Sequence, residues 1–258
     1  MEHVLSGDAR IAWRSDGDTG KPALFLCNSI GTDHTAWEVV MPQLTQHFRV
    51  IRMDTRGHGE SDAPNADYTL NQLAGDIEAV ATAAELKQFD VCGVSLGAMM
   101  AMAYAVNQPQ RLRRLVLCNT STHMDPQAWQ QRMDTVRTQG LAAIADMAMS
   151  RFFTPEYVER NDPALQQVRE RFLKLSPEGY TGCCAAIRDM ALTEQLHRIQ
   201  VPTLVLTGAR DVSTPHAAGQ AIAERIPGAQ IRQLPAAHIS ANEAPELFCE
   251  ALVDFLID

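Results

Sequence analysis

Gly93-Val94-Ser95-Leu96-Gly97 is the stretch that decides the fold of this chain. It lies between a short apolar run, residues 89–92, and a helix-forming stretch, residues 98–106. A serine on a sharp turn from a strand into a helix needs small residues two positions to either side, because the turn brings those neighbours against adjacent strands. Gly93 and Gly97 meet this need. An ordinary glycine–serine turn is the alternative, but the position between a strand and a helix favours Ser95 as a nucleophile.

Strand-like and helix-like segments alternate along much of the chain. Helical patterns are clearest at 70–84, 96–106 and 245–256, and apolar, strand-like runs lie at 9–13, 23–27, 50–53, 89–92, 115–118, 203–206 and 230–234. This alternation predicts the α/β class, with a mostly parallel sheet that helices cover on both faces. With 258 residues, the chain is long enough for one such domain that carries an insertion.

The alternation stops between Thr120 and Gln200. This segment has no convincing strand and is rich in Ala, Gln, Met, Arg and Leu at helical spacing. Several short helices are expected there, because proline favours the first turn of a helix and occurs at Pro126, Pro155, Pro163 and Pro177. We therefore expect an α/β core built from residues 1–119 and 201–258, and a helical cap built from residues 120–200.

Composition and charge exclude several classes of protein. The 21% of charged and 46% of hydrophobic residues are ordinary for a globular chain, and a net charge of −9 argues against a nucleic-acid partner. No segment approaches the ~20 apolar residues of a membrane span, and residues 1–10 lack a signal-peptide core, so we expect a cytoplasmic protein without a membrane partner. Nothing in the sequence specifies an oligomeric state. The cysteines show no Cys-x-x-Cys spacing and are expected to be reduced core residues: Cys27, Cys92, Cys118, Cys183, Cys184 and Cys249.

Two further residues complete a candidate catalytic triad. A serine hydroxyl is a weak nucleophile until a base takes its proton, so Ser95 requires a histidine that a carboxylate orients. Asp211 follows the apolar run 203–206, and His238 follows the run 230–234. Both are expected at the edge of the sheet that carries Ser95, because the carboxyl ends of parallel strands meet there. Asp211 is also compatible with a turn-forming aspartate, and the two roles can coexist.

The reaction also needs donors for the negative oxygen that develops on an attacked carbonyl, and backbone N–H groups can supply them. One donor is expected from Leu96, which follows the nucleophile at the start of a helix. The second is expected from Ile30, in the loop after the run 23–27. Gly31 would let this loop bend toward the substrate, although a plain turn is the alternative.

No metal or cofactor is predicted. The sequence has no His-x-x-x-His pattern and no Cys/His cluster, and His34 beside Asp33 is a weak pair of ligands. It also has no phosphate-binding glycine loop and no dinucleotide fingerprint. The stretch from Asp54 to Asp62 (DTRGHGESD) follows a strand and is rich in turn formers. We interpret it as a structural loop held by local salt bridges.

Five segments resemble one known family: NSIGTDHTAW (28–37), DTRGHGESDAP (54–64), GVSLG (93–97), LVLCNT (115–120) and PEGYTGCCAAIRDM (177–190). These are similar to the 3-oxoadipate enol-lactonases of the α/β-hydrolase superfamily. The resemblance covers nearly the whole chain and implies an eight-stranded, mostly parallel sheet with a helical cap. In some relatives the acid follows the strand 115–118, where this chain has Asn119, so Asp211 has no obvious rival.

By this resemblance, the substrate would be the enol-lactone formed in bacterial breakdown of catechol or protocatechuate, and the product would be 3-oxoadipate. Such a substrate carries a free carboxylate, and the expected cap contains many arginines: Arg132, Arg137, Arg151, Arg160, Arg169, Arg171 and Arg188. We favour Arg188 as its partner, with a salt bridge to Asp189 or Glu194 as the alternative reading. Trp129 is a second candidate pocket residue, with core packing as its alternative.

Other functions fit parts of the same pattern. A general carboxylesterase, a carbon–carbon bond hydrolase or a cofactor-free perhydrolase would keep the triad and change the substrate. A ligand receptor that retains the triad belongs to another class, and the complete triad argues against it. The sequence therefore predicts a serine hydrolase that opens a carboxylated small-molecule lactone.

Overall fold

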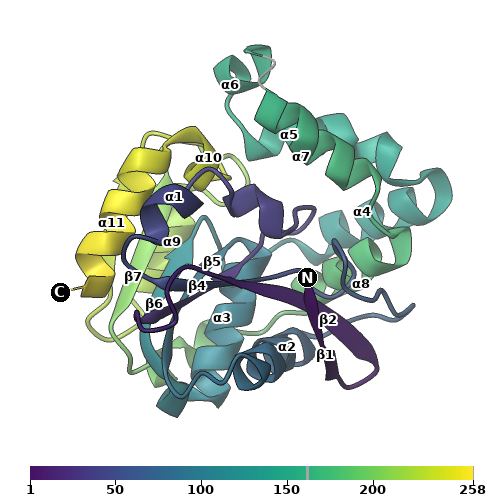
Figure 1. The fold of residues 1–258 in the computed structure, drawn as a ribbon. Coiled ribbons are helices and arrows are strands. Elements are labelled where there is room, and N and C mark those ends of the chain that lie inside the picture. Colours follow the sequence, from purple (N-terminus) through teal and green to yellow (C-terminus); the bar gives the residue numbers. More distant parts are fainter. Residues whose placement is uncertain (161–162, 258) are drawn as a thin grey trace.

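An eight-stranded sheet forms the centre of the computed structural model, which describes residues 1–160 and 163–257 (Figure 1). The strand order is β1-β2-β4-β3-β5-β6-β7-β8. Strand β2 runs antiparallel to both of its neighbours, and every other adjacent pair is parallel. The strands are β1 (Glu2–Ser6), β2 (Ala9–Asp16), β3 (Ala23–Cys27), β4 (Arg49–Met53), β5 (Phe89–Val94), β6 (Leu112–Cys118), β7 (Thr203–Gly208) and β8 (Gln230–Leu234).

Each of the predicted strand-like runs lies in one of these strands, and only β1 was not predicted. Strand β1 is an edge strand whose side chains are mostly exposed, with Leu5 68% exposed. It therefore lacks the continuous apolar run that marks the strands buried on both faces. The central strands β3 and β5 are buried along their whole length.

Helices cover the sheet on two faces. Helices α2 and α3 pack against each other, α1 packs against α11, and α9 packs against β7 and β8 (Figure 1). These helices, with α10, have the bounds α1 (Met41–Leu44), α2 (Leu70–Ala83), α3 (Leu96–Asn107), α9 (His216–Ala223), α10 (Ser240–Glu243) and α11 (Pro245–Ile257). Short 3-10 helices, η1 to η4, lie at His34–Trp37, Pro109–Arg111, Leu141–Ile144 and Thr193–Arg198.

The segment between β6 and β7 is helical, as predicted, and none of its described residues lies in a strand. Its insertion helices are α4 (Pro126–Gln139), α5 (Ala145–Phe152), α6 (Pro155–Glu159), α7 (Pro163–Leu173) and α8 (Pro177–Arg188). All four prolines singled out in the sequence are first residues of these helices. In Figure 1 helices α5, α6 and α7 stand apart from the helices that flank the sheet.

The core is dense and apolar. Helix α3 is buried from Leu96 to Val106, so it has no polar face. All six cysteines are buried and unpaired, which confirms the expectation from their spacing. Among the described residues, no helix has both the length and the apolar character needed to cross a lipid bilayer.

Candidate active site

Ser95 lies on a tight turn between β5 and α3. Its backbone has φ 56° and ψ −116°, a conformation that non-glycine residues rarely adopt and that is associated with functional sites. A Cβ at Gly93 would lie 2.4 Å from the carbonyl carbon of Gly97, and one at Gly97 would lie 2.2 Å from the carbonyl oxygen of Cys27. The two glycines therefore allow the close approach that the strained turn requires, as the sequence predicted.

Asp211 and His238 are brought together at the same edge of the sheet. Asp211 follows β7, His238 follows β8, and His238 Nδ1 lies 2.8 Å from Asp211 Oδ2. Asp211 also accepts hydrogen bonds from the backbone N–H of Ser213 and from the backbone and hydroxyl of Thr214. Burial opposes ionisation of this carboxyl, but the His238 ring and these donors outweigh it and lower the pKa of Asp211 to about 2. An ionised Asp211 can only accept, so Nδ1 of His238 carries its proton and Nε2 is left free to accept one.

Asn119 joins the loop that carries Asp211 to the loop that carries His238. Its side-chain Nδ2 donates to Asp211 Oδ2 and to the carbonyl of Ala237, both at 3.1 Å. Its Oδ1 accepts a hydrogen bond from the hydroxyl of Ser240 at 2.7 Å. Asn119 is fully buried and has φ 46°, which asparagine tolerates better than most residues. Asn119 thus helps to fix the orientation of the Asp211 carboxylate.

Ser95 and His238 line one pocket beneath the insertion helices. No hydrogen bond joins the Ser95 hydroxyl to the His238 ring in the described structure, and such bonds often tighten only when substrate is bound. The ring of Phe152, the last residue of α5, stacks on His238 at 6.1 Å between centroids. The backbone N–H of Ile239 donates to the carbonyl of Phe152 at 3.0 Å. Helix α5 thus contacts the histidine loop directly.

The two predicted donors to a developing oxyanion lie beside Ser95. Ile30 lines the pocket, and Leu96 is the first residue of α3. Neither backbone N–H donates a hydrogen bond within the described part of the chain. The loop that carries Ile30 is held by its neighbour Gly31, whose N–H donates to His58 Nε2 at 2.9 Å. It is also held by Asn28, which contacts Met53 and Trp37 through its side-chain amide.

The pocket is narrow and mostly apolar. Its free volume is about 30 Å³, enough for about one or two water molecules. A larger cavity of about 420 Å³ lies next to it. Four residues line both spaces and therefore form the boundary between them: Met124, Trp129, Arg132 and Arg151.

Of the two candidate substrate-binding residues, one lines the pocket and the other does not. Trp129 lines the pocket, as expected, although it is also buried. Arg188 does not line the pocket and forms ion pairs with Asp67 at 3.0 Å and Asp189 at 2.6 Å. The alternative reading of Arg188, a salt bridge with Asp189, is the one that the structure shows. The sequence could not reveal this, because the side of α8 that faces the pocket depends on how the insertion helices pack.

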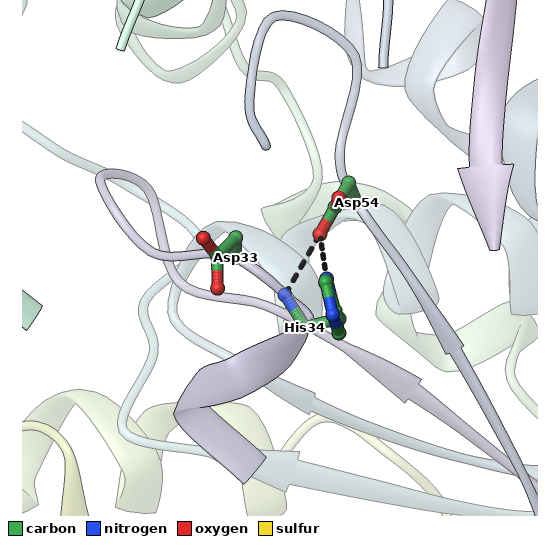
Figure 2. A group of neighbouring side chains, drawn as sticks. All are labelled: Asp33, His34 and Asp54. Carbon is green, nitrogen blue, oxygen red and sulfur yellow. Dashed lines mark hydrogen bonds and ion pairs between the residues drawn. The ribbon is translucent and has the colours of Figure 1, made fainter. Parts of the chain in front are cut away.

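Among the described residues, the group that most resembles a metal site is Asp33, His34 and Asp54, shown in Figure 2. Their potential ligand atoms lie within 4.8 Å of one another. Asp54 Oδ1 already accepts hydrogen bonds from the backbone N–H and the ring Nδ1 of His34, drawn as dashed lines in Figure 2. Asp33 pairs with Arg171 at 3.0 Å. Arg171 and Lys174 line the adjoining cavity, and their charges oppose a cation. We therefore assign this group a structural role.

Known proteins share this architecture. A family model of the alpha/beta hydrolase fold matches residues 22–143. A 3-oxoadipate enol-lactonase of Acinetobacter baylyi is 35% identical over 96% of this chain and 94% of its own length. The crystal structure of the enol-lactonase from Burkholderia xenovorans has a TM-score of 0.97, with 36% identity and full coverage of both chains. The chain belongs to the 3-oxoadipate enol-lactonase family.

This membership confirms the α/β-hydrolase fold that the sequence predicted, and the chain is a hydrolase of lactone or ester bonds. A thermophilic esterase from Thermogutta terrifontis has the same fold at 28% identity, with a TM-score of 0.90 and coverage of 99% of this chain and 97% of that one. The enol-lactonase fold here uses three supporting residues that sequence reasoning missed: Phe152, Thr214 and Glu243. Only Thr214 had a local signal, because it lies three residues after Asp211 in a turn.

Proposed function

We propose that this protein hydrolyses 3-oxoadipate enol-lactone to 3-oxoadipate, with Ser95 as the nucleophile, His238 as the base and Asp211 as the residue that orients it. The observation that carries the proposal is the 2.8 Å contact between Asp211 and His238, a residue that lines the same pocket as the strained Ser95. The two enol-lactonases described above support the choice of substrate. By the same likeness, the reaction would serve the breakdown of aromatic compounds.

The chemistry would proceed in two stages. Nε2 of His238 takes the hydroxyl proton as Ser95 Oγ attacks the lactone carbonyl, and the oxygen that becomes negative meets the N–H groups of Ile30 and Leu96. The ring C–O bond then breaks, and the enolate leaves with a proton from His238 and becomes the ketone. Water, deprotonated by His238, attacks the ester carbonyl on Ser95. The bond between the acyl carbon and Ser95 Oγ then breaks, His238 returns the proton to Oγ, and the second carboxylate leaves. These steps consume one water and need no cofactor.

The narrow pocket adds a requirement. Its free volume of about 30 Å³ holds only about one or two water molecules, so we expect boundary side chains or insertion helices to move when substrate enters. Motions of this kind commonly accompany substrate entry and exclude water afterwards.

The proposal is tested by a coupled assay in which the enol-lactone is generated in the reaction mixture. The wild type should consume the lactone far faster than its spontaneous hydrolysis, and Ser95→Ala should lose at least about a thousandfold in rate. The variant Ser150→Ala, at an exposed serine outside the pocket, is the matched control and should keep full activity. Turnover no faster than the spontaneous reaction would refute the proposal. Parallel assays with nitrophenyl acetate and a vinylogous diketone would identify a general esterase or a carbon–carbon bond hydrolase instead.

A further inference from the structure

Helix α7 of the insertion packs against the Ile30 loop, residues 28–33. Phe172, in the last turn of α7, is fully buried. A Cβ at Gly31, the residue after Ile30, would lie 2.9 Å from two ring carbons of Phe172. Gly31 also has φ 83°, a conformation that favours glycine. The end of α7 therefore lies directly against the backbone beside Ile30.

An ion pair joins the same two elements. Arg171 of α7 lies 3.0 Å from Asp33, the last residue of the Ile30 loop. Asp33 also accepts hydrogen bonds from the backbone N–H and the hydroxyl of Thr35. Burial opposes ionisation of this carboxyl, but Thr35 and Arg171 outweigh it and lower the pKa of Asp33. Arg171 therefore pairs with a carboxylate that is both charged and largely removed from water.

A second arginine on α7 provides a comparison. Arg169 pairs with Asp146 at 3.0 Å, and both partners belong to the insertion. The side chains of Arg169 and Arg171 are almost equally exposed, at 42% and 43%. Asp146, however, is 89% exposed, whereas Asp33 is 7% exposed. Exposed ion pairs contribute little, but a buried carboxylate that loses its partner is strongly penalised. We therefore expect the pair of Arg171 to hold its elements together and the pair of Arg169 to contribute little.

Both contacts of α7 lie within three residues of Ile30 in the sequence. The loop between them is tight, because the carbonyl of Ser29 accepts hydrogen bonds from the backbone N–H of Thr32 at 3.2 Å and from its hydroxyl at 2.9 Å. A shift of α7 should therefore displace the backbone of Ile30. An oxyanion donor acts only at about 2.7–3.1 Å from the oxygen, so a small displacement weakens it.

We propose that Arg171 is a positioning residue, which acts through Asp33 to hold the backbone N–H of Ile30 where the reacting oxygen becomes negative. Because α7 belongs to the insertion, this donor is in place only while α7 lies against the core. An insertion that has moved to admit substrate must therefore return before acyl transfer is fast. The inference rests on the proposed function for the role of Ile30, and it adds a dependence of catalysis on the position of α7.

Steady-state kinetics with 4-nitrophenyl acetate test this role. Arg171→Gln should lower kcat by about three- to tenfold and leave KM nearly unchanged. Formation and hydrolysis of the acyl-enzyme both pass through an oxyanion, so both stages slow together and the ratio of their rates, which enters KM, is preserved. Arg171→Lys, which keeps the charge, should recover part of the loss. Arg169→Gln is the matched control and should keep the kcat of the wild type.

A double variant separates an effect through Asp33 from a general loosening of the insertion. Asp33→Asn keeps an acceptor for Thr35 but removes the charge, so it should reproduce the loss in kcat of Arg171→Gln. The protein with both changes should be no slower than either single variant, because each change removes the same interaction. Thermal unfolding of every variant is followed by circular dichroism, and kcat is measured well below the lowest unfolding temperature of the set.

Any of three results would overturn the proposal: an unchanged kcat in Arg171→Gln, an equal loss in Arg169→Gln, or losses in Arg171→Gln and Asp33→Asn that multiply in the double variant. The substrate is a nitrophenyl ester, so the outcome is separate from that of the enol-lactone assay.

Discussion

The Nε2 atom of His58 accepts a hydrogen bond from the backbone N–H of Gly31 at 2.9 Å. His58 is buried, and its other ring nitrogen lies 3.3 Å from the carbonyl of Arg56, which accepts the remaining N–H. The loop from Asp54 to Asp62 thus supports the loop that carries Ile30. The loop is structural, as interpreted, but its ion pairs are not local, because they reach Arg10, Asp8 and Asp76 outside it. The element that it supports lies beside Ser95.

Loss of this support should slow the chemistry more than it weakens binding. We expect His58→Ala to lower kcat about tenfold with little change in KM, because a loosened Ile30 N–H stabilises the transition state less well. His58→Gln, which keeps an acceptor, should retain more of the rate. His47→Ala, at an exposed histidine, serves as the control. This role would be contradicted if steady-state kinetics of His58→Ala showed a change in KM and no change in kcat.

His58 should also make stability depend on pH. Burial lowers the pKa of His58 below its ordinary value of 6.5, although the charges of Asp54 and Asp33 oppose this. Below about pH 6.5 the unfolded chain therefore binds a proton that the folded chain does not, and the free energy of unfolding falls as pH falls. Urea unfolding at pH 8 and pH 5.5 should show a larger loss in the wild type than in His58→Gln. Equal losses in both proteins would be evidence against a neutral, buried His58.

Asn119 can be tested through its side chain and its backbone separately. Asn119→Gly removes the two donors to Asp211 and Ala237 but keeps a residue suited to φ 46°. We expect it to lower the free energy of unfolding by about 1–3 kcal/mol. Asn119→Ala should cost about 1 kcal/mol more, because alanine is strained at positive φ. If urea unfolding ranks the alanine variant as the more stable one, the backbone argument is wrong.

Gly179 of α8 lies against Gly57, so that a Cβ on Gly179 would be 2.4 Å from the Cα of Gly57. Gly179→Ala must push α8 away from the loop of His58 and should destabilise the protein by about 1–3 kcal/mol. Gly75 in α2 has no atom within 4 Å of its Cβ position and is the matched control. Gly75→Ala should stabilise the protein by about 0.5–1 kcal/mol. Thermal unfolding of both variants checks the contrast, and a similar effect in both would contradict it.

The features that sequence predicted well are those that depend on neighbouring residues. The turn at Ser95, the helix starts at the insertion prolines and the positions of Asp211 and His238 after parallel strands all follow from local rules. Parallel pairing then brings the three catalytic candidates to one edge, whatever the details of packing.

The features that were missed depend on residues far apart in sequence. Arg188 and Arg132 lie on α8 and α4, which pack together, and only that packing decides which of them reaches the pocket. Phe152 stacks on His238 although the two residues are 86 positions apart, and the local sequence around either residue does not predict this contact. Such contacts are set by tertiary structure, which periodicity and turn chemistry do not encode.

Glu243 joins the insertion to the histidine loop. Its carboxylate accepts hydrogen bonds from the backbone and hydroxyl of Thr154 and from the backbone N–H of Ala237, next to His238. The insertion is therefore not a detachable module. A graft of the insertion from another hydrolase would need to bring a matching partner for Glu243. Without one, it would be expected to alter the position of His238 together with the shape of the pocket. Evolution of substrate preference in this chain is thus coupled to the geometry of catalysis.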